Sequence, residues 1–254
     1  MHTSEPLVVT FCDSRYLPLL TIWLDRLESL ELPRIRIYAL DAATLAWCRA
    51  RAVEALPLEW RGDLQELWVK RIGVFRALLA AGEEFIHSDA DAIWLRNPLQ
   101  EGSARDLQDD LVFSQGTVWP PDVHDRWGFV LCCGWFRARP TAVVHAFFRA
   151  LENDVRAIGD DQICVNRLLA AAGATWQHAG SGDYRLMFRD RPLECWSTPI
   201  HAILPTASLS VALLPHGEFQ RLPEASERAV VKHYLTPKNC GQKLIALREF
   251  GLIP

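Results

Sequence analysis

The first 90 residues alternate between short apolar runs and longer stretches with helical periodicity. The runs 7–12 and 35–40 are typical of buried strands. A helix is predicted after the first run, from about Pro18. Another follows the second run, from its N-cap Asp41 to about Ala52. Because parallel strands need crossover connections, this order predicts a parallel sheet with right-handed crossovers.

Polar side chains follow the apolar runs of this predicted sheet. Asp13 and Tyr16 come directly after the first run. A helical stretch from Val69 to Ala81 then leads to another apolar run, Phe85-Ile86, which is followed by two aspartates. Ligands of open α/β sheets bind outside the carboxyl ends of the strands, so we expect a binding site at this edge.

The two aspartates, Asp89 and Asp91, are one residue apart. On an extended segment their side chains would project to the same side of the backbone. A divalent cation would relieve their mutual repulsion, and such a pair of oxygen ligands suits a metal-bound pyrophosphate. For an Asp-x-Asp pair without further context, a solvated acidic turn is the commoner interpretation.

The rest of the chain predicts a mixture of elements without an internal repeat or linker, which favours one domain over residues 1–254. Strands are predicted at 111–113, 129–136 and 230–233, and a loop from Gln115 to Gly128. Helices are predicted from Thr141 to about Leu151, from Gly159-Asp160-Asp161-Gln162 to near Gly173, and from Gln242 to Phe250. The stretch from Gly180 to Glu227 is Pro-rich and is predicted to be irregular, with short strands near Ile203 and Leu213.

Composition excludes several classes of protein. Half of the residues are hydrophobic and 23% are charged, as in folded globular proteins. The net charge is −4 and no block of Lys or Arg stands out, which argues against nucleic acid as a partner. No apolar run approaches the roughly 18 residues of a membrane span, and the N-terminus lacks a basic signal region. Seven cysteines without a repeating framework favour reduced thiols, and we expect a cytoplasmic location.

The block Ser88 to Pro98, with Trp94, Leu95 and Arg96 beside the two acids, resembles the central motif of nucleotide-diphospho-sugar transferases with the GT-A fold. It is most similar to the group that includes plant xylosyl-, galactosyl- and arabinosyltransferases. The likeness covers roughly Leu7 to Leu252. It continues through residues 133–141, Asp161-Gln162 with Asn166, Leu214-Pro215 with Phe219, and His233 with Gly241 and Lys243. The last of these groups also resembles, with altered spacing, the C-terminal motif of bacterial lipooligosaccharide galactosyltransferases.

The resemblance implies a single Rossmann-like GT-A domain of the α/β class, with a mixed, mainly parallel central sheet flanked by helices. Residues 1–98 would form the nucleotide-binding half, and residues 99–254 the sugar and acceptor half. The implied activity is that of a metal-dependent, retaining glycosyltransferase. It would move a sugar from a nucleoside-diphosphate sugar, UDP-linked rather than GDP-linked, to a glycan, a lipid-linked glycan or a protein.

The resemblance also implies roles for particular residues. Asp89, Asp91 and His233 would bind Mn²⁺ or Mg²⁺, although a lone His at a strand end is usually only a hydrogen-bonded polar residue. Asp161 and Gln162 would contact the transferred sugar near its anomeric carbon, with Asp161 orienting and stabilising; the alternative is that Asp160 or Asp161 is only a helix cap. The implied donor-binding residues are Thr10, Asp13, Tyr16, Lys70, Arg71, Asp89, Ala90, Gly134, Gly241 and Lys243.

One departure and two alternatives remain open at this point. Cys133 occupies the place where many relatives carry Asn or Ser, so the choice of donor sugar is open. The chain could be a non-catalytic GT-A module that binds nucleotide sugars. The spacing Asp89-x-Asp91 also resembles haloacid-dehalogenase phosphatases, but these enzymes place their first Asp after the opening strand, and 88 residues precede Asp89 here.

Overall fold

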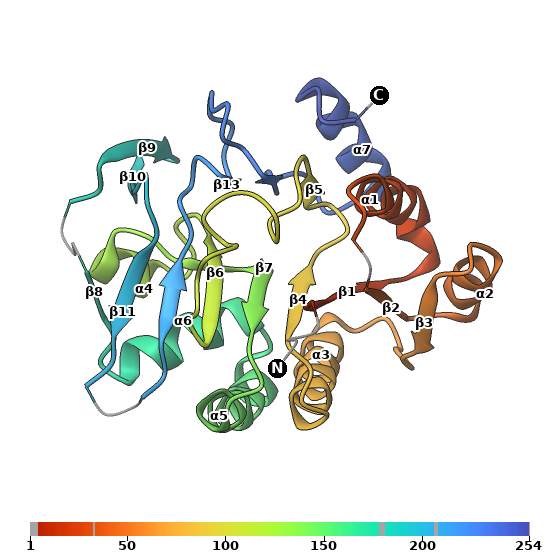
Figure 1. Cartoon of the computed structure of the whole chain (residues 1–254), viewed down its shortest axis with the longest axis horizontal. Helices are drawn as coiled ribbons and strands as arrows, with labels where there is room; N and C mark the ends of the chain where they lie inside the picture. The colour runs from red at the N-terminus through yellow and green to blue at the C-terminus, as the bar shows by residue number, and fades with distance from the viewer. Residues whose placement is uncertain (1–4, 33, 178–180, 206–207, 254) are drawn as a thin grey trace.

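The computed structural model of the chain describes residues 5–32, 34–177, 181–205 and 208–253. Its centre is a nine-stranded sheet that crosses the whole molecule (Figure 1). The strands, in their order across the sheet, are β3 (Glu54–Pro57), β2 (Ile35–Ala39), β1 (Leu7–Cys12), β4 (Phe85–Ser88), β7 (Leu131–Ala138), β6 (Leu111–Gln115), β12 (Val211–Leu213), β11 (Ile200–Ile203) and β8 (Thr175–Trp176).

The sheet is mixed but mainly parallel, as the family resemblance implies. Strands β3, β2, β1 and β4 pair in parallel, and so do β6 and β12. Strand β7 is antiparallel to both of its neighbours, and β11 is antiparallel to both of its own. Among the described strands of this sheet, therefore, β7 and β11 alone run against the rest. The carboxyl ends of β1 and β4 meet at one edge.

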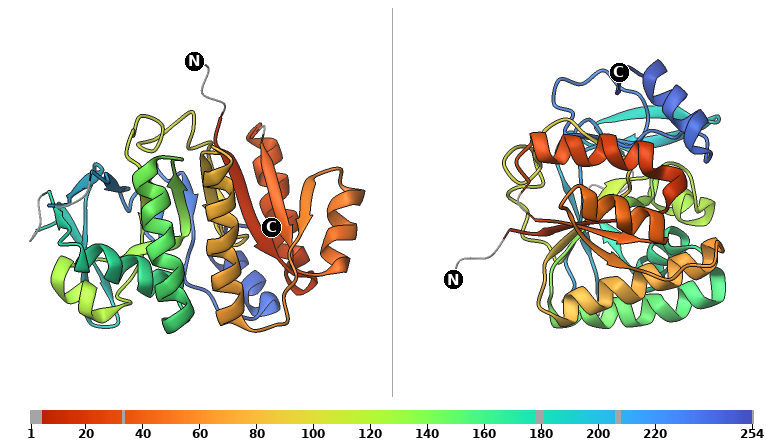
Figure 2. Two further views of the ribbon diagram at one scale, coloured as in Figure 1. Left: turned by 90° about the horizontal axis from the view of Figure 1, so that it is seen from below. Right: turned by 90° about the vertical axis from the view of Figure 1, so that its right-hand side faces the viewer.

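Helices cover both faces of the sheet (Figure 2). Helices α3 (Leu64–Ala80), α4 (Pro121–Trp127), α5 (Ala142–Ile158) and α6 (Asp161–Ala171) pack on one face, and α1 (Leu17–Ser29) and α2 (Ala42–Ala50) pack on the other. Strand β1 shows why two layers form: Leu7 and Val9 enter one apolar cluster, whereas Val8 and Cys12 enter the other. Each large side chain buried in this way contributes about 1.5–3 kcal/mol.

A smaller three-stranded sheet lies beyond the carboxyl ends of the central strands (Figure 1). It consists of β13 (Phe219–Gln220), β14 (Val231–Lys232) and β5 (Ile93–Trp94), and Val231 pairs with Trp94 across the antiparallel pair β14–β5. This pairing brings the C-terminal part of the chain beside the segment that follows the two aspartates. Helix α7 (Cys240–Glu249) lies at the same end (Figure 1), and the 3₁₀ turn η1 (Ser14–Tyr16) contacts the segment before it, through Tyr16 and the Lys238 carbonyl.

Several predicted boundaries were wrong for local reasons. Helix α3 begins at Leu64 rather than Val69, because the Asp63 carboxylate accepts the N–H groups of Gln65 and Glu66 as an N-cap. The predicted loop 115–128 contains α4, which opens on two prolines. Helix α5 continues past Leu151 to Ile158 and ends at Gly159, whose φ of +80° suits glycine.

The Pro-rich stretch after residue 180 is more regular than expected. It contains an antiparallel hairpin, β9 (Tyr184–Phe188) and β10 (Arg191–Cys195), whose turn holds Arg189 and Asp190 at positive φ. Gly180 itself lies outside the described residues. The strands near Ile203 and Leu213 are confirmed as β11 and β12, while β7 starts two residues later than predicted. No helix in the described part of the chain is long and apolar enough to cross a membrane.

Candidate active site

Asp89 and Asp91 lie in a tight turn after β4, not on an extended segment as predicted. The Asp89 carbonyl accepts the N–H of Ala92 at 3.0 Å, with Ala90 and Asp91 at the corner of the turn. The Asp89 N–H donates to the Gly134 carbonyl of β7 at 2.8 Å, which fixes the start of the turn. The carboxylates therefore converge because the backbone turns, and not because side chains alternate along a strand.

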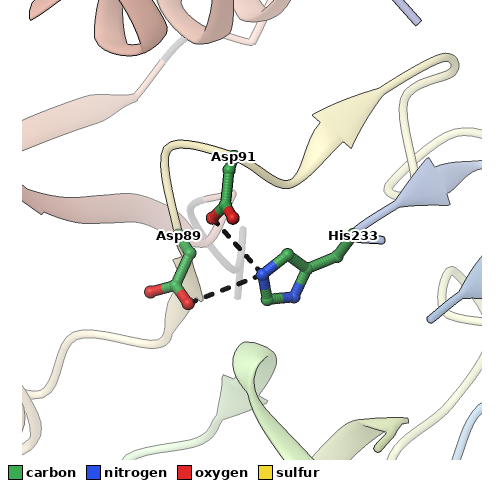
Figure 3. A group of neighbouring side chains, drawn as sticks. All are labelled: Asp89, Asp91 and His233. Carbon is green, nitrogen blue, oxygen red and sulfur yellow. Dashed lines mark ion pairs between the residues drawn. The ribbon is translucent and has the colours of Figure 1, made fainter. Parts of the chain in front are cut away.

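His233 completes a compact cluster with the two aspartates (Figure 3). Its Nε2 lies 3.7 Å from Asp89 Oδ2 and 3.3 Å from Asp91 Oδ1. One ligand atom from each residue lies within 4.8 Å of the others, as a single metal ion requires. The His233 backbone is held by Gln220, whose carbonyl accepts its N–H at 2.9 Å, and by Arg221, which donates to its carbonyl at 2.6 Å.

Gly134 makes room for this cluster. A Cβ at this position would overlap the His233 ring at Cε1 and lie 2.8 Å from Asp89 Oδ2, so any side chain there would displace the ligand atoms. The cluster thus offers a metal ion two carboxylates and one imidazole as ligands. Hard oxygen ligands with a single imidazole suit Mn²⁺ or Mg²⁺, and the cluster fits such an ion.

The charges in the cluster are strongly coupled. Burial disfavours the charged form of Asp91, but His233 and Lys243 outweigh it and hold the pKa of Asp91 well below its usual range. Burial and Arg221 likewise oppose a charge on His233, yet the Asp91 carboxylate prevails and raises the pKa of His233 to about 9. Without a metal ion, the imidazolium and the Lys243 ammonium that contacts Asp91 supply the positive charge that the two aspartates attract.

Arg71 links this cluster to Asp161. Arg71, on α3, is only 5% exposed, and its guanidinium lies 3.7 Å from Asp89 and 3.3 Å from Asp161. Burial raises the pKa of Asp161, while Arg71 opposes the shift. One arginine thus connects the predicted metal pair with the predicted sugar-contacting carboxylate.

His87 is a part of the site that sequence reasoning missed. Its Nε2 lies 2.8 Å from an Arg71 nitrogen and 3.1 Å from Asp89 Oδ1. Burial, assisted by the Arg71 cation, lowers the pKa of His87 to about 4, so the neutral ring accepts a hydrogen bond from Arg71. The sequence feature that could have indicated His87 is its position two residues before Asp89. A His within an apolar strand is, however, too common to indicate a site residue.

The helix cap of α6 is Asp160. Its carboxylate accepts the Ile163 N–H at 2.8 Å, which leaves the Asp161 side chain free to face Arg71. The next side chain, Gln162, accepts the Cys133 N–H at 3.4 Å and donates to the Trp119 carbonyl at 2.9 Å. Of the two neighbouring aspartates, Asp160 is therefore the helix cap, and Asp161 is not.

The predicted donor-binding residues are not all in one place. Lys243 contacts Asp91, and Tyr16, whose pKa is raised by burial and by the Asp91 charge, donates to the Lys238 carbonyl. Asp13 caps η1 and pairs with Arg15, Thr10 is fully buried in β1, and Gly241 lies in the first turn of α7. Lys70 is instead engaged by Glu66 and the Glu59 carbonyl in a separate groove along α3.

The two neighbouring cysteines of β7 have different surroundings. Cys133 packs into the apolar cluster on the α3–α5 side, whereas Cys132 Sγ lies 3.8 Å from His233 Nδ1. Cys133 is therefore part of the apolar core, and Cys132 is the thiol beside His233. All seven cysteines are free thiols.

Comparison with known proteins identifies the family. Residues 30–241 match the sequence model described as nucleotide-diphospho-sugar transferase. The chain belongs to this family. Its members are glycosyltransferases, so the family match leaves no place for the phosphatase interpretation. No curated protein matches the sequence.

The fold of this family member is also that of solved glycosyltransferases. The galactosyltransferase LgtC, in complex with donor and acceptor sugar analogs, is 14% identical with a TM-score of 0.52 over 96% of this chain and 94% of its own. GlyE of Streptococcus pneumoniae TIGR4 is 13% identical with a TM-score of 0.48 over 65% of this chain. The chain spans 43% of the length of GlyE. The likeness to LgtC confirms the GT-A architecture.

Proposed function

We propose that this chain is a retaining glycosyltransferase that uses a UDP-sugar donor and a bound Mn²⁺ or Mg²⁺. The observation that carries the proposal is the convergence of Asp89, Asp91 and His233 at the carboxyl end of β4. Residues 1–98 would bind the nucleotide and residues 99–254 the sugar and the acceptor within one domain. The pairing of β4 with β7, one strand from each part, supports placing both parts in a single domain.

The three ligands have a clear chemical task. A divalent ion held by them would neutralise the charge that develops on the diphosphate as the sugar departs, which is worth several kcal/mol. Lys243 contacts Asp91 and is placed to offer its ammonium to a phosphate as a point charge. Tyr16 and Asp13 follow β1 at the same edge, where a nucleotide would lie in an open α/β sheet.

Asp161 has a different task in the proposal. A sugar that leaves its phosphate becomes positively charged, and a nearby carboxylate stabilises that charge more in the transition state than in the ground state. The ion pair with Arg71 holds Asp161 in one orientation, and Gln162 is held by Cys133 and Trp119. In a retaining front-face reaction the departing phosphate takes the proton of the acceptor hydroxyl, so Asp161 orients and stabilises rather than attacks.

The test is Mn²⁺-dependent binding of UDP to Asp91→Ala. The wild type is expected to bind UDP only with the metal, and the variant is expected to lose this dependence, because one of three protein ligands is absent. Calorimetry measures the binding, and circular dichroism checks that the variant is folded. Asp106→Ala, which removes an exposed carboxylate paired with Arg105, is the matched control. Unchanged metal-dependent binding in Asp91→Ala would overturn the metal role.

Hydrolysis of the donor separates an enzyme from a binding module. Water replaces the acceptor slowly in many transferases, so the wild type is expected to release sugar from one UDP-sugar of a panel when Mn²⁺ is present. Binding of UDP without hydrolysis or transfer for any donor would favour the non-catalytic module. Thermal stabilisation by each donor selects the candidates for this assay, since a ligand that binds the folded state raises its stability.

A further inference from the structure

Trp119 differs from the other tryptophans of the chain. All ten lie in the described residues, and Trp119 is the exposed one, with 55% of its surface accessible. Six others are buried and three are half-buried. A single exposed apolar side chain needs no explanation by itself, so its location decides what it means.

Trp119 lies beside the proposed sugar-contacting pair. Its carbonyl accepts the side-chain amide of Gln162 at 2.9 Å, and Gln162 follows Asp161 in α6. Asp161 in turn lies 3.3 Å from Arg71, which is 3.7 Å from Asp89. A chain of contacts therefore leads from the metal cluster through Asp161 and Gln162 to the backbone of Trp119, the residue that carries the exposed indole.

The segment that carries Trp119 is held rigidly. Pro120 and Pro121 follow it and fix the backbone at the start of α4. Asp122 accepts two hydrogen bonds from Arg167 of α6, at 2.9 and 3.1 Å. On the other side, His124 contacts the Pro192 carbonyl of the β9–β10 hairpin at 2.9 Å. Because the backbone that carries the indole is already ordered, little backbone entropy is lost when a ligand covers it.

We propose that Trp119 is a stacking platform for a sugar ring of the acceptor, so that the acceptor is a saccharide or carries one. This inference rests on the proposed function and names the acceptor class for the same site. One face of a pyranose presents C–H groups that pack on an aromatic ring, while its hydroxyls need hydrogen-bonding partners. Trp119 would supply the apolar face, and Gln162, whose amide bonds the Trp119 carbonyl, would supply the nearest polar group, with Asp161 one residue before it in α6.

The direct test uses the intrinsic fluorescence of Trp119. Acrylamide quenching of the wild type minus that of Trp119→Phe isolates this residue. Free disaccharides and methyl glycosides of common hexoses and pentoses are the probes, with and without UDP and Mn²⁺. At least one sugar is expected to protect the wild type from acrylamide and to leave Trp119→Phe unaffected. Trp47→Phe, which alters a half-buried indole stacked on Arg51, is the matched control and should keep the protection.

A kinetic test follows with the protective sugar as acceptor. Trp119→Ala is expected to raise the acceptor KM about 10-fold, as the loss of an aromatic stacking contact predicts, and to leave kcat within about twofold. Trp119→Phe should restore most of the affinity, because a smaller aromatic face remains. An equal loss in kcat with unchanged KM would overturn the stacking role.

Two further outcomes separate this inference from the proposed function. If UDP and Mn²⁺ bind normally and no sugar protects Trp119, the acceptor inference is wrong and the transferase proposal stands. If a sugar protects Trp119 and UDP does not bind, the transferase proposal is wrong and the saccharide site stands. Quenching that falls with protein concentration would overturn the inference in favour of a contact between two copies of the chain.

Discussion

Asp160 and Asp161 are adjacent in sequence but have different partners. Asp160 accepts a backbone N–H at the start of α6, and Asp161 faces the guanidinium of Arg71. Asp161→Asn is therefore expected to lower turnover by orders of magnitude while UDP affinity stays nearly unchanged. Asp160→Asn is the matched control, since Asn caps a helix about as well as Asp. Donor hydrolysis and UDP affinity are measured on both; normal turnover in folded Asp161→Asn would move the catalytic assignment elsewhere.

His233 couples metal binding to pH. Its pKa is raised to about 9 by Asp91, so a metal ion must displace a proton at neutral pH. Mn²⁺ affinity is therefore expected to rise between about pH 6 and about pH 8 in the wild type, and this rise should be lost in His233→Ala, whose affinity is about 10- to 100-fold weaker. His145→Gln, on α5, is the control. Identical Mn²⁺ titrations for wild type and His233→Ala at both pH values would remove His233 from the site.

The same group affects the metal-free protein with the opposite sign. A folded pKa of about 9 lies above the unfolded value of about 6.5. The His233–Asp91 pair therefore stabilises the metal-free fold fully below about pH 6.5, and this contribution is lost as the pH rises through about 9. Metal-free protein should lose stability over this range of pH, whereas metal affinity gains over it.

At the scale of elements, β7 is the strand on which the site depends. It pairs with β4 so that Gly134 lies against Asp89 and His233. Gly134→Ala is expected to weaken Mn²⁺ binding at least 10-fold, because its Cβ takes the place of the imidazole. Gly73→Ala, in the middle of α3, is the control. An added Cβ would have no neighbour within 4 Å there, so the change should stabilise the fold by about 0.5–1 kcal/mol. Equal Mn²⁺ affinity in both variants would contradict the close packing.

The elements that the sequence predicted well are those with local causes. Asp41 caps α2 through the Thr44 N–H, and β1 and α1 follow directly from apolar spacing. The pairing of β5 with β14 has no local signal, because strands of two residues depend on partners far away in the chain. The hairpin β9–β10 was missed because Pro192 lies within it.

The candidate site was predictable to a similar extent. Asp89, Asp91 and His233 were expected from the family motif, and they converge. Arg71 and Lys70 were both predicted to bind the donor, because the sequence does not show which of two neighbouring basic residues faces the site. In the structure Arg71 lies beside Asp89, whereas Lys70 lies in the separate groove along α3. His87 and Cys132 contact the site only because of how β4 and β7 are packed, which no motif records.

At the scale of the whole molecule, His87 makes the free energy of unfolding depend on pH in the acidic range. Its folded pKa of about 4 lies below the unfolded value of about 6.5, so the unfolded chain binds an extra proton between these values. The free energy of unfolding is expected to fall by about 3 kcal/mol as the pH drops from about 6.5 to about 4. Urea unfolding across this range measures it. His87→Gln should flatten this decline, and an unaltered decline would assign it to another group.

The pairing of β5 with β14 gives the metal site a second consequence. Its ligands come from the acidic turn and from the segment that leads to α7, which are distant in sequence. An ion bound by both segments would cross-link them, as a disulfide does, and a chelator would remove this cross-link. Amide hydrogen exchange in residues 234–253 is therefore expected to slow with Mn²⁺ and to accelerate with EDTA. The cation that activates the donor would then also decide how firmly the C-terminal helix is held against the rest of the protein.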